Sequence, residues 1–183
     1  MVAYVSQSIE GVALLTLYTA YDQTAAISST NTPDNPGPPF TIGTEVVATD
    51  GSIWMFVKFG GVVVQYDVVA IDPATTIAIG LLGGGAETVK KRVGFYQGAT
   101  STTSSNYGWV MVSGVPTINV LGAAAKNVQL YSTDTTGKLD DAILTGSQFP
   151  IKNVYLTTTI GSTASFNTAQ AAWPSIGLTG SLV

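Results

Sequence analysis

The most regular pattern of hydrophobic and polar positions lies at residues 53–59, IWMFVKF. Side chains of a β-strand alternate between two faces, so the odd-numbered and even-numbered residues here lie on opposite sides. One face holds Ile53, Met55, Val57 and Phe59, and the other holds Trp54, Phe56 and Lys58. The period of two predicts a β-strand.

A second apolar run follows at once. Gly60-Gly61 permits the positive φ of a tight turn, and Val62 to Ile71 alternates again. Val62, Val64, Tyr66, Val68 and Ala70 share one predicted face, and Val63, Gln65, Asp67, Val69 and Ile71 share the other. The pattern predicts a β-hairpin whose second strand ends at Asp72-Pro73.

Short runs rich in Val, Ile, Tyr, Trp and Thr continue along the chain. They are RVGFYQGA (92–99), NYGWVMVSG (106–114), PTINVLG (116–122), NVQLYST (127–133) and NVYLTTTI (153–160). Gly, Pro, Asn or Ser bounds each run, and the spacing is typical of a sandwich or barrel. The glycines at 83–85 indicate a loop, residues 132–141 a turn, and Trp109 a core position. The expected fold class is mainly β.

Helical content is expected to be small, with at most one or two short helices. Residues 163–172 have helical spacing of Phe166, Ala169, Gln170 and Trp173, and Pro174 supplies a stop. A brief helix capped by Asp140-Asp141 is the alternative to a plain turn there.

A proline-rich stretch at residues 29–40, STNTPDNPGPPF, marks the one clear boundary. Its prolines lack backbone donors and fix φ, so no helix or central strand runs through it. The sequence therefore predicts an extended N-terminal arm and Pro-rich linker at residues 1–40 and a β-rich domain at 41–183. The segment before the prolines fits either a strand or a short amphipathic element.

Charge is scarce. Charged residues make up 10% of the 183 residues, against roughly 25% in an average soluble domain. Neutral Thr, Ser, Asn, Gln and Gly replace them, and such groups cost less to desolvate than ions do. This composition favours surfaces that are buried against partners, because interface cores are depleted in charge.

The same balance excludes several partners. The net charge is −4 and only seven residues are basic, so a phosphate-binding surface for nucleic acid is not expected. Lys90-Lys91-Arg92 fits a solvated turn or strand edge better than an anion site. The apolar run near the N-terminus is too short to cross a bilayer, so we expect no membrane association and no secretion.

Catalytic chemistry is poorly represented. With no histidine and no cysteine, imidazole or thiolate catalysis and their metal sites are excluded. The remaining carboxylate pairs, Asp67 with Asp72 and Glu45 with Asp50, are five apart, so a regular strand directs their members to opposite faces. We expect no enzyme and no cofactor.

Two loops resemble ligand motifs only superficially. GLLGGGAETVKK (80–91) lacks the phosphate-loop spacing, and it indicates a flexible β-loop. The acids Asp134, Asp140 and Asp141 offer oxygen ligands without the spacing of a calcium loop, so a turn with solvated acids is favoured over a metal site.

Aromatic residues admit two interpretations. Trp54, Tyr66, Tyr107, Trp109 and Trp173 offer flat rings on which a sugar can stack. In β-rich domains such rings are more often core or subunit-interface residues, and we favour that interpretation.

The order of several blocks resembles a known family. GTEVVATDGSIWMFVKFGGVVVQYDVVAID is followed by RVGFYQGA, NYGWVMVSG, NVQLYSTDTTGKLDD and AAWP, over residues 43 to 174. In this order the blocks resemble the capsid decoration, or cement, proteins of tailed bacteriophages.

The resemblance implies a single β-barrel or β-tulip-like domain, commonly a homotrimer, on the exterior of the virion capsid. The implied partner is the major capsid protein, whose neighbouring subunits it bridges after assembly in the host cytoplasm. No active-site residue is carried over. The alternative is a phage fibre or surface module that binds host glycans.

The arm and one strand supply the candidate contacts with the capsid or with a sister subunit. Arms with apolar residues and a proline spacer have little to fold on alone, so we expect residues 1–40 to contact another chain. The candidate contact residues are Val2, Tyr4, Pro36, Pro38, Pro39, Phe40 and Trp54.

Overall fold

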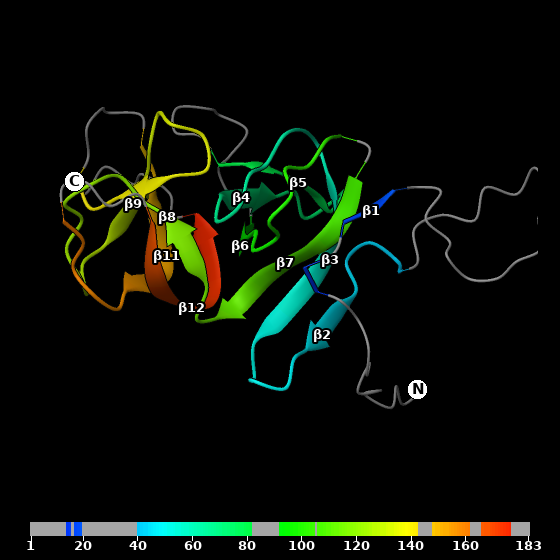
Figure 1. Cartoon of the computed structure of the whole chain (residues 1–183), viewed down its shortest axis with the longest axis horizontal. Helices are drawn as coiled ribbons and strands as arrows, with labels where there is room; N and C mark the ends of the chain where they lie inside the picture. Colours follow the sequence, from blue (N-terminus) through cyan, green and yellow to red (C-terminus); the bar gives the residue numbers. More distant parts are fainter. Residues whose placement is uncertain are drawn as a thin grey trace, which may run out of the picture.

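The computed structural model describes residues 14–15, 17–19, 40–81, 92–104, 106–142, 148–161 and 166–176. In these ranges all regular structure is β, with twelve strands and no helix (Figure 1). The strands are β1 Tyr18–Thr19, β2 Glu45–Val47, β3 Ile53–Phe59, β4 Val68–Ile71, β5 Ile77–Gly80, β6 Arg92–Phe95, β7 Asn106–Gly114, β8 Thr117–Asn119, β9 Leu130–Ser132, β10 Leu139–Asp140, β11 Pro150–Leu156 and β12 Phe166–Ile176. The mainly β class is confirmed.

Five of the strands close into a barrel. β3 pairs with β7 on one side and with β5 on the other, β5 pairs with β4, and β4 pairs with β6. The pairing of Phe95 in β6 with Met111 in β7 completes the ring. All neighbours are antiparallel except β3 and β5, which run parallel. Closure leaves none of these strands with a wholly unpaired edge.

The interior of this barrel is narrow and filled by side chains, as expected for so few strands. Its cluster consists of Met55, Val57, Phe59, Val63, Val69, Ile71, Ala78, Tyr96, Val110 and Val112. At Gly94 there is little room, because a Cβ there would lie 3.0 Å from both Ile71 Cδ1 and Val110 Cγ2. Glycine is therefore the residue that fits this point of β6.

A second strand group, β8 to β12, packs beside the barrel and joins it through β12. β12 pairs with β11 and β8, and its backbone also pairs with Gly114 and Ser113 of β7 and with Arg92 of β6. β11 pairs with β9 and β9 with β10. A parallel bridge joins Leu139 of β10 to Val120, the residue after β8, so β10 lies next to the end of β8.

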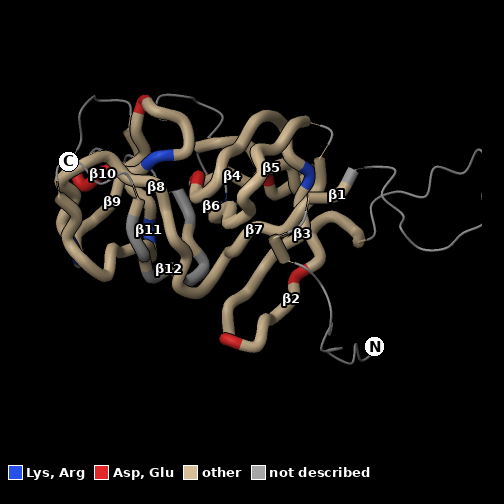
Figure 2. Tube along the Cα trace, in the orientation of Figure 1, with Lys and Arg blue, Asp and Glu red and all other residues tan. Residues whose placement is uncertain are grey.

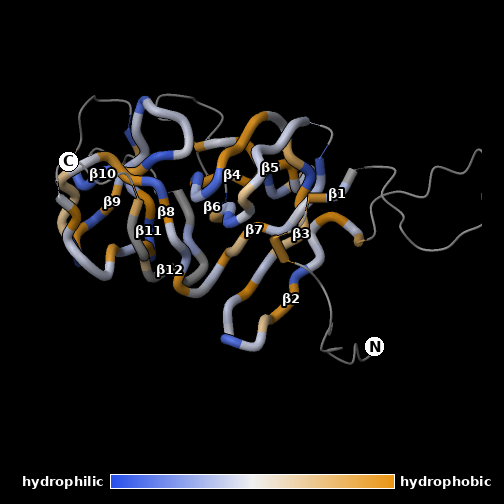
Figure 3. The backbone as a smooth tube through the Cα atoms, in the orientation of Figure 1, coloured by the Kyte–Doolittle hydropathy of each residue, from blue (hydrophilic) through white to orange (hydrophobic). Residues whose placement is uncertain are grey.

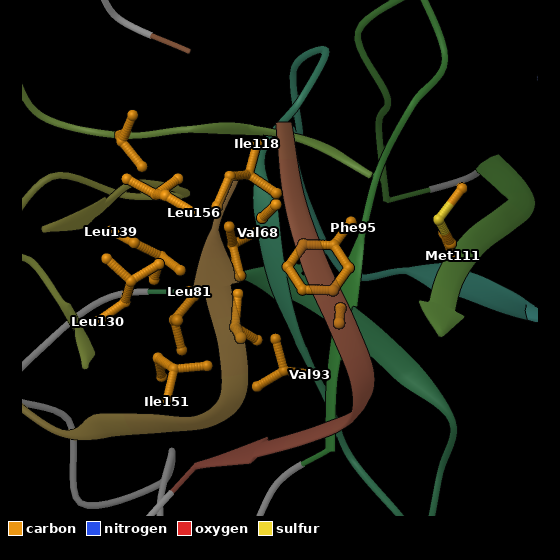
Figure 4. Close-up of a cluster of buried hydrophobic side chains, with 14 of the residues drawn as sticks. Val68, Leu81, Val93, Phe95, Met111, Ile118, Leu130, Leu139, Ile151 and Leu156 are labelled. Carbon is orange, nitrogen blue, oxygen red and sulfur yellow. The ribbon is translucent and has the colours of Figure 1, made fainter. Parts of the chain in front are cut away.

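The larger core lies between the outer face of the barrel and this second group. Figure 4 shows side chains from both sides converging, with Val68, Val93 and Phe95 from the barrel strands. The facing residues of the second group are Ile118, Leu130, Leu139, Ile151 and Leu156, all fully buried. Barrel strands therefore bury apolar residues on both faces.

The predicted alternation of residues 53–59 is confirmed. Met55, Val57 and Phe59 enter the barrel interior, whereas Trp54 and Phe56 belong to the larger core. The runs expected at residues 92–99, 106–114, 116–122 and 127–133 each contain a strand, whereas β11 starts three residues before the expected run 153–160 and ends at Leu156. The predicted turn joins β9 to β10.

The predicted hairpin at Gly60-Gly61 is wrong. β3 does not pair with β4. It pairs with the parallel strand β5, and the chain from residue 60 to 67 is a loop. Gly60 does not have a positive φ. A Cβ at this position would lie 2.7 Å from Ile79 Cγ2 and 2.9 Å from Ile77 Cγ2. The glycine is required because β5 crosses closely over it.

The predicted helix at residues 163–172 is also wrong in the described part, because β12 is a strand from Phe166 to Ile176. Pairing with β8, β11 and β7 outweighs a weak helical spacing in so short a segment. Pro174 does not end the element, since it lies where the register with β11 shifts around Asn153, which has a φ of 62°.

Alanine substitution of the two adjacent glycines tests whether Gly60 is needed because β5 leaves no room for a Cβ. Gly60→Ala should lower the free energy of unfolding by about 1–3 kcal/mol, because the stiff branched methyls of Ile77 and Ile79 occupy the space. Gly61→Ala is the matched control. No atom lies within 4 Å of its added Cβ, so it should be neutral or slightly stabilising. Urea unfolding of both variants measures the difference, and equal effects would contradict this packing.

Candidate interaction surface

The members of the first carboxylate pair, Asp67 and Asp72, make separate structural hydrogen bonds. Asp72 accepts hydrogen bonds from the backbone N–H of Ala74 and Thr75 and so closes the turn after β4. Asp67 is buried in the wall between the two strand groups. It accepts from Val64 N at 2.9 Å and from Asn119 Nδ2 at 2.9 Å.

Gly137 explains how Asp67 is enclosed. This glycine has a φ of 77°, and a Cβ there would lie 2.4 Å from Asp67 Cγ. Its carbonyl accepts from Val68 N and its N–H donates to Leu81 O. Burial raises the pKa of Asp67, although its hydrogen bonds oppose that shift. The carboxylate thus ties the 60–67 loop to β8.

The second pair is likewise divided. Glu45 forms an ion pair with Arg92 and so links β2 to β6. Asp50 accepts from the hydroxyl and N–H of Ser52, and these hydrogen bonds lower the pKa of Asp50. Glu45 thus makes a long-range ion pair, whereas Asp50 makes local hydrogen bonds.

The acids of the β9–β10 turn do not gather as ligands. Among the described residues no group of three or more acids is placed to hold a metal ion. Asp141 instead accepts from Ala125 N at 2.8 Å. Burial and the neighbouring Asp141 raise the pKa of Asp140.

Two of the three tryptophans lie in the core. Trp54 is 6% exposed and Trp109 is 1% exposed. Trp54 Nε1 donates to Ser52 Oγ at 2.7 Å, whereas Trp109 Nε1 is buried without an acceptor. Neither ring offers a face to a sugar, and the core assignment of Trp109 is confirmed. Nothing is described of the Trp173 side chain.

An aromatic cluster covers the outer face of β3 and β7. Phe40 meets Phe56 and Trp109 edge-on, with ring centroids 5.3 and 5.1 Å away. Tyr18 meets Phe40 at 6.1 Å and Phe56 at 5.9 Å, and Tyr107 stacks on Phe56. The predicted contact residue Phe40 is therefore half-buried within its own chain, next to the described part of the predicted arm.

Large apolar side chains nevertheless remain at the surface. Those exposed among the described residues are Leu15, Ile42, Val47, Val62, Val64, Val115, Val128, Tyr155 and Phe166. Val47 on the outer strand β2 is 71% exposed and Val62 in the 60–67 loop is 67% exposed. Figure 3 shows hydrophobic stretches along β2 and along the loop that follows β3.

One aromatic pair combines the half-buried Tyr66 with the exposed Phe166. Tyr66 has a φ of 69°, which costs free energy for a bulky residue. Its ring lies 5.4 Å from that of Phe166, which is 55% exposed. The sequence indicates Tyr66 as a candidate stacking ring but not Phe166, whose spacing predicts a helix. Only the pairing of β12 with β8 brings the two rings together.

Charges around these side chains are few. In Figure 2 most of the drawn trace carries neither acidic nor basic residues, and the charged positions are scattered. The described part of the chain holds no helix with the length and apolarity needed to cross a membrane. The described surface is thus neutral and partly apolar.

The remaining predicted contact residues, Val2, Tyr4, Pro36, Pro38 and Pro39, lie outside the described residues. So do the 83–85 loop and two residues of the basic run. Arg92, its third member, belongs to β6 and pairs with Glu45.

No protein-family model matches the chain, and no curated protein matches it.

The raised pKa of Asp67 predicts a definite pH dependence. Because the folded pKa lies above the unfolded value near 3.8, the folded state retains the proton to higher pH. The associated stability is fully present below 3.8 and is lost as the pH rises through the folded pKa. Relative to Asp67→Asn, the wild-type free energy of unfolding should therefore fall between pH 3.8 and neutrality.

Urea unfolding at a series of pH values measures this difference. The contribution of Asp140, whose pKa is also raised, is common to both proteins and cancels. A wild-type stability that rises against the variant over this range would show that Asp67 is stabilised as an anion.

Proposed function

We propose that this protein is a structural, non-enzymatic component of a bacteriophage virion that decorates the outside of the capsid. It binds the major capsid protein and stabilises the shell by bridging neighbouring capsid subunits. Self-association, with a trimer favoured, belongs to the same proposal.

The observation that carries the proposal is an outer surface with exposed apolar side chains and little charge. Val47 projects from strand β2 and Val62 from the loop after β3, and a surface of this kind loses little on desolvation against a partner. Repetition over a shell adds the free energy of many modest contacts, so no chemistry at a site is needed. The resemblance in block order supports the same function.

Binding to heads tests the proposal directly. Purified full-length protein should bind undecorated heads of the parent phage saturably and in stoichiometric number, on the outer surface seen by cryo-electron microscopy. Since few ions are involved, raising the salt from about 0.1 M to about 1 M, where the Debye length falls from roughly 10 to 3 Å, should change affinity only slightly.

Two substitutions sharpen this test. Val47→Asp or Val62→Asp adds a charge at an exposed apolar position and should weaken head binding at least at one of the two sites while the fold is retained. Lys126→Gln, which leaves the apolar positions intact, is the control. Failure of the wild type to bind heads, or loss of binding at high salt, would contradict the proposal.

The alternative is a fibre or surface module that binds host glycans. The observation in its favour is that the rings of Phe166 and Tyr155 are exposed and so can stack on a sugar. Trp54 is buried and cannot. Saturable binding on a glycan array that is lost in Phe166→Ala or Tyr155→Ala, without head binding by the wild type, would favour this alternative. Under the capsid proposal no such binding is expected.

A further inference from the structure

The N-terminal segment docks on the barrel in a way that two copies of the chain can exchange. We propose that Leu17 and β1 of one copy occupy the barrel of a second copy, so that each barrel is completed by its neighbour. This specifies the self-association in the proposed function, and it does not depend on capsid binding.

The segment makes two distinct contacts with the barrel. Leu17 is half-buried and packs against the cluster inside the barrel. Leu14 and Tyr18 instead pack against the larger core, with Tyr18 edge-on to Phe40 and Phe56. Every barrel therefore needs such a segment, because without it apolar groups inside and outside β3 and β7 meet water.

The attachment itself is short. β1 pairs with β7 through two positions only, Tyr18 with Tyr107 and Thr19 with Asn106. Next to it, Leu15 stays 59% exposed when the segment is docked. A two-residue ladder with half-buried side chains can detach locally at small cost, since local opening follows from few buried contacts.

Chain length allows the segment to reach another copy. Residues 20–39 separate β1 from Phe40, and 20 residues span at most about 65–70 Å. Four of them are prolines, and proline-rich spacers resist folding back on themselves. Docking within one chain and docking between two chains make the same contacts, so the linker and the protein concentration decide between them.

The absence of cysteine from the whole sequence permits an unambiguous test. The register places Thr19 opposite Asn106. Full-length Thr19→Cys and Asn106→Cys proteins, each purified and checked for folding by circular dichroism, are mixed at high micromolar concentration, incubated to allow exchange, and oxidised. Non-reducing electrophoresis and mass spectrometry then identify any disulfide between the two chains.

Exchange predicts a disulfide-linked heterodimer through positions 19 and 106. It should form about tenfold faster than in a control mixture of Val47→Cys and Asn106→Cys, because docked thiols have an effective concentration in the millimolar range, against high micromolar in the mixture. The double variant Thr19→Cys/Asn106→Cys should give covalent multimers at high concentration. If the double variant forms only an intrachain disulfide at every concentration and the mixture gives no more heterodimer than the control, the proposal is wrong.

Failure of this test is separable from failure of the proposed function. A chain that decorates heads but forms only intrachain disulfides retains its capsid role and loses the exchange. A chain that exchanges but does not bind heads shows the reverse.

Discussion

The structure depends on burying both faces of β3 and β7. Their inner residues fill a barrel of only five strands, and their outer faces carry the buried apolar residues Trp54, Phe56, Trp109 and Met111. A ring this small has room inside only for the inward-facing side chains. The apolar side chains on its outer face must therefore be covered by other parts of the protein. β12 and the second strand group cover one part of that face, and Phe40 with Tyr18 covers another.

This constraint also accounts for where polar groups are found. Asp67 is enclosed between the barrel and β8, and it stays hydrogen-bonded to both sides because a buried carboxylate without partners would be costly. Glu45 and Arg92 join β2 to the barrel across 47 residues of sequence. Among the described residues Glu45, Arg92 and Asp67 connect separate segments of the fold, and the rest of the described surface carries few charges.

Local patterns predicted those elements that are determined locally. The alternation in β3, the run in β7 and the core position of Trp109 follow from side-chain period and composition, and the structure has all three. The prediction of a hairpin after Gly60 is wrong because β3 pairs with β5. β5 is a parallel strand, and a local turn signal cannot indicate such a partner. The spacing around Phe166 and Pro174 predicts a helix and its stop, because nothing local reveals that β12 pairs with β7, β8 and β11.

The candidate surface was predictable in character but not in position. Low charge indicated a surface made for partners, whereas the residues that carry it, such as Val47, Val62 and Phe166, emerge only once the strands are paired. Trp54, a predicted contact residue, lies on the face of β3 that joins the larger core and is buried within its own chain. The described arm residues Leu14, Leu17, Tyr18 and Phe40 pack against the barrel of their own chain.

The central claim is that this barrel, with a thinly charged surface, is completed by other copies of itself. Sedimentation velocity of the unmodified full-length protein from nanomolar to high micromolar concentration tests it most directly. The account predicts a reversible shift from the 18.9 kDa chain to a defined oligomer as concentration rises. A single species of monomer mass over the whole range would contradict it.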